Sequence, residues 1–204
     1  MLLEGATDGV CDDDSCWGSA MEKNDIDFKA KALIEGAHLL WEQDDYENAL
    51  KQYQEALLLL ERSNNRNACA KVLNNMGHIY VKRRNFDKAF ACFREACNIY
   101  KELENKLGMA DQLQNMGSVC RDNKDYDTAL GHYYDSLFLF EQLEHTMGTA
   151  NQMTNIGYIF AMKHDPFAAL DWFERALALY EKEKQYERAE LTKQNIENLR
   201  RLVE

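Results

Sequence analysis

Proline is almost absent from this sequence of 204 residues: Pro166 is the only one, and there are ten glycines. Both residue types interrupt helices, so their scarcity removes the usual breaks in helical structure. The composition is instead rich in Ala, Leu, Glu, Gln, Lys and Met, which favour helices over strands. The sequence therefore predicts an all-α protein with almost no sheet.

Basic residues are outnumbered, since 24 Lys and Arg face 35 Asp and Glu and give a formal charge of −11. A nucleic-acid binder needs a concentrated basic face to neutralise phosphates, so we expect no nucleic-acid partner. No apolar run approaches the roughly 20 residues that a membrane span needs. Leu3 is followed at once by Glu4, which leaves no room for a signal-peptide core. We expect no membrane partner and a cytoplasmic location.

The six cysteines lack the spacing of a zinc module or of a secreted disulfide framework. Four of them fall inside helical pattern as small apolar residues, which suits reduced thiols in the cytosol. The other two, Cys11 and Cys16, flank a run of acids without a histidine nearby, so we interpret that segment as a solvated acidic tail. The sequence predicts no metal site.

Catalytic patterns are missing as well. The five histidines are scattered along the chain, and no Gly-rich turn joins a strand to a helix where a nucleotide could bind. We therefore expect neither an enzyme nor a cofactor.

The sequence does contain a repeat of 40 residues. Four independent columns agree: Ala49, Ala89, Ala129 and Ala169; Tyr53, Phe93, Tyr133 and Phe173; Ala56, Ala96, Ser136 and Ala176; Leu60, Tyr100, Phe140 and Tyr180. A further column holds small residues: Ala37, Gly77, Gly117 and Gly157. Each unit is divided by a polar turn such as Arg83-Arg84-Asn85, which predicts two antiparallel helices per unit.

The first helix of the second unit has apolar or small residues at Leu73, Met76, Gly77 and Tyr80, which define one core-facing stripe. A single hairpin cannot bury its stripes, so each unit needs its neighbours and the units should stack.

The expected organisation has three parts. Residues 1–24 carry six acids and one base without periodicity, and we expect a disordered acidic tail that ends at a helix cap formed by Asn24 or Asp25. Residues 25–190 hold four tandem units, at about 30–69, 70–109, 110–149 and 150–189. Residues 187–204 are expected to form a capping helix, because Glu197 stands where earlier units have glycine.

These columns resemble the tetratricopeptide repeat, whose Leu, small, aromatic and Ala positions recur here at the family's relative spacing across residues 26–190. The usual unit has about 34 residues, and the longer unit is similar to the variety found in cell-polarity adaptors and kinesin light chains. The resemblance implies a right-handed superhelical α-solenoid of four TPR helical hairpins plus the C-terminal capping helix. It also implies a role in binding other proteins.

The face opposite the core stripe is the candidate functional surface. In the second unit it carries Lys71, Asn75, His78 and Lys82. Asparagines recur on this face at intervals of 40 residues: Asn75, Asn115, Asn155 and, in the cap, Asn195. A row of carboxamides can pair with the N–H and C=O groups of an extended peptide, and long-repeat members of the family carry such asparagine ladders. The alternative is that each asparagine bonds the helix of a neighbouring repeat.

Specificity would come from residues beside the asparagines. Lys71, His78 and Lys82 form a candidate basic spot, with Arg121 added by the third unit and Tyr158 on the same face of the fourth. An ordinary solvated helix face is the alternative interpretation. The set of Lys, Asn and Arg with which some family members clamp the carboxylate of a chaperone tail is not reproduced here.

The sequence thus predicts a protein–protein interaction scaffold or adaptor that binds an extended segment of a partner in a concave groove. Two alternatives stay open. One is a self-assembling structural module, in which the partner is a second copy of the chain and a homo-oligomer forms. The other is a regulatory subunit that acts on an enzyme in trans.

Overall fold

The computed structural model describes the backbone of residues 13–203 and the side chains of residues 23–203. This range is helical throughout apart from short turns, and it contains no strand. The helices are α1 (Asp13–Glu42), α2 (Tyr46–Arg62), α3 (Arg66–Lys82), α4 (Phe86–Glu102), α5 (Lys106–Asp122), α6 (Tyr126–Gln142), α7 (Thr146–Met162), α8 (Pro166–Lys182) and α9 (Tyr186–Val203). The prediction of an all-α fold is confirmed, while the right-handed sense of the superhelix stays a prediction.

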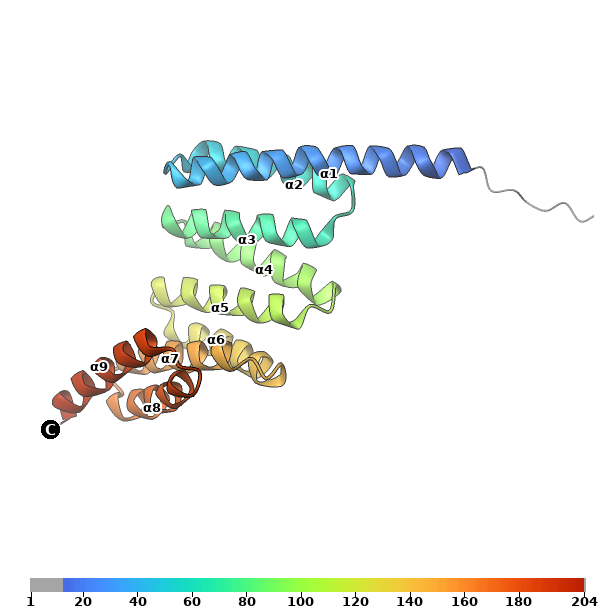
Figure 1. The fold of residues 1–204 in the computed structure, drawn as a ribbon. Coiled ribbons are helices and arrows are strands. Elements are labelled where there is room, and N and C mark those ends of the chain that lie inside the picture. Colours follow the sequence, from blue (N-terminus) through green and yellow to red (C-terminus); the bar gives the residue numbers. More distant parts are fainter. Residues whose placement is uncertain (1–12, 204) are drawn as a thin grey trace, which may run out of the picture. The chain divides into compact units, whose positions relative to one another are not determined.

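The chain divides into two compact units between Asn65 and Arg66. The first unit contains the hairpin of α1 and α2, and the second contains α3 to α9. Within the second unit the helices follow one another in a stack, each packed on the next along the chain (Figure 1). This order agrees with the expected series of hairpins, in which each helix pair is covered by its neighbour.

Every turn between consecutive helices has three residues, and its middle residue has a positive φ. The eight are Asp44, Asn64, Arg84, Glu104, Lys124, Glu144, His164 and Lys184, with φ between 52° and 65°. After the middle residue the chain donates back to the preceding helix, as when the N–H of Asn85 bonds the carbonyl of Tyr80 at 2.9 Å. This is the Schellman arrangement, which ends a helix and satisfies its last carbonyls.

Most of these turns also cap the helix that follows. The side chain of the third turn residue accepts a hydrogen bond from the backbone N–H three positions later. The residues that do so are Asp45, Asn85, Asn105, Asp125, His145 and Asp165. Because the same turn serves within and between hairpins, the turns recur every 20 residues, which is half the period of the sequence repeat.

The core of each hairpin is a seam of aromatic side chains against small residues. Tyr133 and Phe93 are almost fully buried. A Cβ added to Gly77 would lie 2.5 Å from Cε1 of Phe93, and one added to Gly117 would lie 2.7 Å from Cε1 of Tyr133. The aromatic column that recurs every 40 residues in the sequence therefore fills the seams between helices.

The expected start of the first helix is wrong. We expected a cap at Asn24 or Asp25, but α1 already begins at Asp13 and runs through both residues. Residues 13–24 contain no proline, and they include Ala20, Met21 and Glu22, which favour helices. The disordered tail predicted for residues 1–24 therefore does not extend over 13–24, and residues 1–12 lie outside the described part of the chain.

The first helix of a hairpin also buries a wider part of its surface than expected, as α3 shows. In α3, Val72 and Ile79 are buried in addition to the predicted stripe of Leu73, Met76 and Tyr80. The extra stripe is needed because such a helix packs both on its own hairpin partner and on the adjacent hairpin. The face left for function is correspondingly narrower than a full half of the helix.

Candidate functional site

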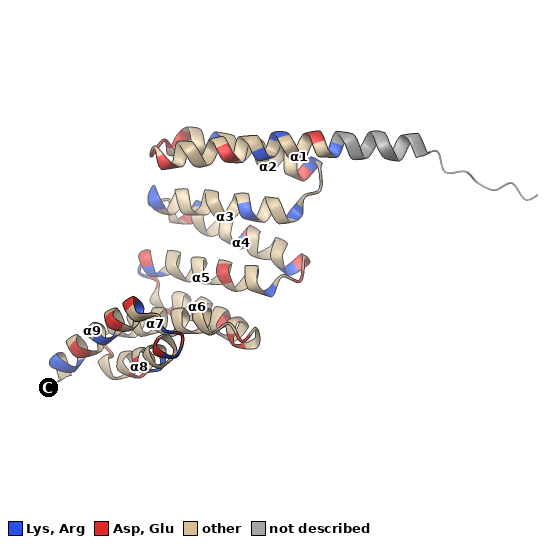
Figure 2. Cartoon of the chain, viewed as in Figure 1, with Lys and Arg blue, Asp and Glu red and all other residues tan. Residues whose placement is uncertain are grey.

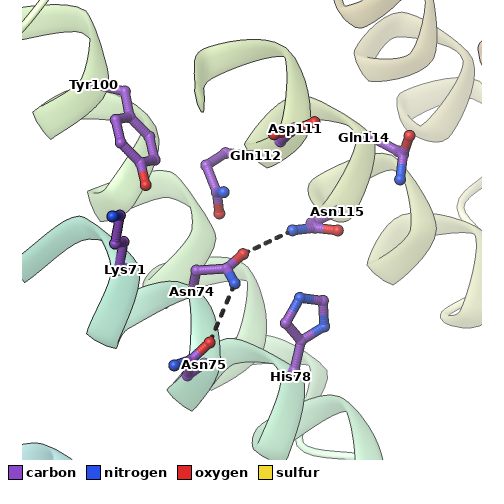
Figure 3. Close-up of a pocket in the computed structure, with 9 residues that line it drawn as sticks. All are labelled: Lys71, Asn74, Asn75, His78, Tyr100, Asp111, Gln112, Gln114 and Asn115. Carbon is purple, nitrogen blue, oxygen red and sulfur yellow. Dashed lines mark hydrogen bonds between the residues drawn. The ribbon is translucent and has the colours of Figure 1, made fainter. Parts of the chain in front are cut away.

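Four of the predicted site residues meet in one pocket of the second unit. Lys71, Asn75 and His78 of α3 and Asn115 of α5 line a cavity of about 560 Å³. The remaining lining residues were not predicted as a group: Asn74, Tyr100, Asp111, Gln112 and Gln114 (Figure 3). Sequence reasoning found the column of asparagines, but it missed the carboxamides directly beside that column.

The other predicted residues do not line this pocket. Lys82 is exposed at the end of α3, and Arg121 pairs with the neighbouring Asp122 at 2.9 Å. Tyr158 of α7 packs edge-on against Phe173, with ring centroids 5.1 Å apart. Asn155 and Asn195 lie further along the stack, on α7 and α9. The basic spot predicted from Lys71, His78, Lys82 and Arg121 is therefore not a single cluster.

The middles of the first helices carry few charges. Between Lys71 and Lys82, α3 contains no Asp, Glu, Lys or Arg, and α7 contains none at all. In Figure 2 the central turns of α3 and α5 are accordingly mostly tan, with charges toward the helix ends. Uncharged polar side chains thus dominate the surface on which the asparagine column lies.

The asparagines bond mainly to other side chains of the second unit. Asn115 donates through Nδ2 to Oδ1 of Asn74 on α3 at 3.0 Å. Asn155 donates to Oε1 of Gln152 in its own helix at 3.3 Å, and Asn195 donates to the hydroxyl of Tyr158 on α7 at 2.7 Å. The bonds of Asn115 and Asn195 are of the helix-to-helix kind that the alternative interpretation of the column expected.

Burial shifts the pKa values of three side chains in the pocket, those of His78, Tyr100 and Asp111. Desolvation lowers the pKa of His78 below its usual value, so the imidazole is neutral at pH 7. Desolvation raises the pKa of the Asp111 carboxyl, an effect that His145 partly opposes. Desolvation, and next the charge of Asp111, raise the pKa of Tyr100. At neutral pH the lining contains one cation, Lys71, and one anion, Asp111, so it has no net charge.

Trp41 of α1, which lies next to the candidate functional face in the sequence, belongs to the first unit and is a candidate ligand anchor. Its ring stacks on that of His38 with centroids 6.4 Å apart, and Nδ1 of His38 shares a hydrogen bond of 3.0 Å with the hydroxyl of Tyr53. His38 is thereby tied to the core of its own hairpin. A role for Trp41 in binding stays a prediction.

The described residues offer neither a metal site nor a membrane-spanning helix. No three His, Cys, Asp or Glu side chains in that part of the chain lie close enough together to hold a metal ion. Cys11 and Cys16 lie outside the residues whose side chains are described. Among the described helices, none combines the length and the apolar character needed to cross a bilayer.

Solved structures with the same arrangement of helices support the fold. BtubC (BKLC) from P. vanneervenii is 17% identical, with a TM-score of 0.65 over 91% of this chain and 92% of that chain. Aspartyl phosphate phosphatase F from Bacillus subtilis is 20% identical, with a TM-score of 0.71 over 76% of this chain. The apo form of RapI is 16% identical, again with a TM-score of 0.71 over 76% of this chain.

These likenesses concern the fold alone. This chain covers 41% of the phosphatase and 44% of RapI, less than half of each. No curated protein sequence matches the chain significantly. A sequence model of the tetratricopeptide repeat does match, over residues 29–102 and 109–182, and together these segments include most of the chain. With the recurrent Ala and aromatic columns buried as that repeat requires, the chain belongs to the tetratricopeptide-repeat family.

Proposed function

We propose that this protein is an interaction adaptor that holds an extended segment of a partner protein along α3, α5 and α7. Membership of the repeat family supports a role in protein–protein interaction. The observation that carries the finer proposal is the polar pocket in which Asn75, Asn115 and their neighbouring carboxamides gather. Such a surface matches the alternating donors and acceptors of a peptide backbone.

The asparagines have hydrogen-bond donors and acceptors left for a ligand in addition to the bonds they already make. A carboxamide has two N–H donors and an oxygen with two lone pairs. Asn115 uses one donor on Asn74, and Asn75 accepts one bond from Asn74 at 3.5 Å. The remaining donors and acceptors are available to the backbone of a bound segment, so the two interpretations of the column are compatible.

The test uses peptides selected against the intact protein from a random 12-residue display library, with affinity measured by fluorescence anisotropy. We expect Asn75→Ala with Asn115→Ala to weaken the selected peptides at least tenfold while the melting temperature stays nearly unchanged. The matched control is Asn98→Ala with Asn198→Ala, which removes two exposed asparagines of α4 and α9. Equal affinity of both double variants and the parent would show that the peptides bind elsewhere.

Self-association is the second candidate function, because α9 exposes large apolar side chains. Tyr186, Leu191 and Leu202 are 74%, 54% and 79% exposed. Apolar residues left open at the end of a stacked array are a common basis for pairing. Light scattering at high protein concentration tests it, since a strict monomer removes this candidate. Regulation of an enzyme in trans and a cytoplasmic location stay predictions.

A further inference from the structure

One buried polar group in the pocket has no partner within the protein. The side chain of Gln112 is 3% exposed, and its Oε1 accepts no hydrogen bond. Its amide end points into the space between Tyr100, Lys71 and Asn74 (Figure 3). A buried acceptor without a donor is unfavourable, so a ligand that brings a donor to this point is bound preferentially.

The next repeat shows how the same position is satisfied internally. Gln152 lies 40 residues after Gln112 and is likewise fully buried. Its Nε2 donates to Oε1 of Gln114 on α5, and its Oε1 accepts from Nδ2 of Asn155 at 3.3 Å. Three carboxamides thus form a continuous chain in which both ends of the buried amide have partners.

Asn74 interrupts this chain one repeat earlier. It occupies the position of Gln114 but has one methylene fewer, so its amide extends less far toward the neighbouring helix. The donor equivalent to Asn155 is Asn115, and that donor is already bonded to Oδ1 of Asn74 at 3.0 Å. Gln112 is therefore left without the donor that Gln152 has, and its amide faces the pocket.

We infer that the pocket binds a carboxamide side chain, an Asn or a Gln, of the segment that the protein captures. The inference rests on the proposed function, because it specifies one side chain of that segment. Oε1 of Gln112 is closed to solvent in the free protein, so the Gln112 amide turns further toward the pocket when the ligand's N–H donates to it. The ligand's carbonyl accepts from donors in the lining, such as the exposed Lys71 or the half-buried Asn75. The ligand amide thus completes the interrupted chain.

Other side chains satisfy this site less well. A carboxylate has no donor for Gln112 and adds a second anion beside Asp111. A lysine or arginine offers donors but brings a cation beside Lys71. An apolar side chain brings no donor to Gln112, so its Oε1, which is already closed to water, stays without a hydrogen bond. Of these four kinds of side chain, the carboxamide alone supplies both a donor and an acceptor without adding net charge to a lining whose charges cancel.

The direct test is an NMR titration of the ¹⁵N-labelled full chain with N-acetyl-glutamine-N-methylamide. We expect saturable shifts of amides in α3 and α5, with binding at least fivefold weaker for the glutamate and methionine analogues of the same probe. Asn74→Gln lengthens the side chain by the missing methylene, completes the internal chain and should abolish the response. Equal binding of the three probes, or an unchanged response in Asn74→Gln, overturns the inference.

Two further variants make the result specific. Gln114→Asn shortens the corresponding side chain one repeat later and should create a second set of saturable shifts, in α5 and α7. Gln112→Met keeps the volume but removes the buried acceptor, so it should lose the preference for the glutamine probe and melt no lower than the parent. A Gln112→Met protein that still prefers glutamine over methionine places the recognition elsewhere and contradicts the inference.

The outcome is separable from that of the adaptor proposal. In one outcome, the library peptides depend on Asn75 and Asn115 for binding and yet bind equally well after their own Asn and Gln residues are replaced by Met. That result would contradict the carboxamide inference but would still support the adaptor proposal. In the reverse outcome, the parent binds the glutamine probe, Asn74→Gln does not, and the library yields no binding peptide. That result would support the carboxamide site and contradict the proposal that the protein holds an extended segment.

Discussion

Nδ2 of Asn115 donates to Oδ1 of Asn74 at 3.0 Å and thereby joins the middle of α5 to the middle of α3. Helices of a solenoid share no backbone ladder, so side-chain bonds of this kind help to fix the position of one repeat on the next. The bond also explains why asparagine is tolerated inside a helix, where its amide otherwise competes for backbone hydrogen bonds.

The stability of the Asn115→Ala variant tests the size of this contribution. We expect the free energy of unfolding to fall by less than about 1 kcal/mol, because the loss of a half-buried hydrogen bond is partly offset by the higher helix propensity of alanine. Asn98→Ala on α4 is the control, since Asn98 is exposed and reports propensity alone. Urea unfolding should leave Asn115→Ala less stable than Asn98→Ala; the reverse order would mean that the bond contributes nothing.

Two glycines of similar helical setting should respond oppositely to alanine. At Gly77 the added Cβ would meet the ring of Phe93 at 2.5 Å, so Gly77→Ala forces the seam apart and should cost about 1–3 kcal/mol. At Gly131 nothing lies within 4 Å of the added atom, so Gly131→Ala should stabilise α6 by about 0.5–1 kcal/mol. Thermal unfolding followed by circular dichroism measures both. Similar effects at the two sites would contradict the tight seam.

The repeat itself could be predicted because packing imposes the same requirement four times. Gly77 and Gly117 recur at the interval of the aromatic rings that cover them. The start of α1 could not be predicted in the same way, since residues 13–24 lack any repeat partner with which to compare. A cap was inferred there from residue type alone, and helix-favouring neighbours continue the helix through it.

The site was predictable only in part. Asn75 and Asn115 were found because they form a column with a constant interval. Gln112 was missed because it stands in a buried stripe whose equivalent in α3 is the apolar Val72, so its one recurrence as Gln152 does not make a constant column. Its lack of a partner depends on the lengths of two side chains on different helices, which only coordinates relate.

Acid should weaken the fold through two half-buried histidines. Desolvation lowers the pKa of His78, and it lowers that of His132 against the opposing charges of Asp135 and Asp125. The folded state then binds fewer protons than the unfolded state just below the ordinary value near 6.5, so the free energy of unfolding should fall as the pH drops through this range. Stability from this source is present above the unfolded pKa and is lost below it.

Urea unfolding of the parent and of His78→Gln with His132→Gln, each at pH 7.5 and 5.5, measures this effect. The double variant should lose less stability than the parent between the two values. Asp111 acts in the opposite direction, because its raised pKa makes the folded state bind protons more tightly as the pH falls toward the usual carboxyl range. An equal loss of stability in both proteins would assign the acid sensitivity to other groups.

The carboxylate of Asp27 on α1 accepts hydrogen bonds from the turn that follows α2, within the first unit. Oδ1 of Asp27 accepts from the hydroxyl of Ser63 at 2.5 Å, and Oδ2 accepts from Nδ2 of Asn65 at 3.2 Å. The substitution Asp27→Ala removes the carboxylate that accepts both of these hydrogen bonds. The Ser63 hydroxyl keeps one other acceptor, the carbonyl of Leu60 at 3.2 Å. We expect a loss of about 1–2 kcal/mol in the first unit, with Asp27→Asn intermediate because it keeps one acceptor.

Hydrogen exchange resolved along the chain shows where that loss occurs. The amides of α1 and α2 should exchange faster in Asp27→Ala, while those of α5 to α9 keep their protection, because the bonds of Asp27 lie inside the first unit. Asp25→Ala is the matched control, since Asp25 is exposed on the same helix. If Asp25→Ala and Asp27→Ala speed exchange equally, the effect comes from charge or helix propensity in α1 and not from the contact with Ser63 and Asn65.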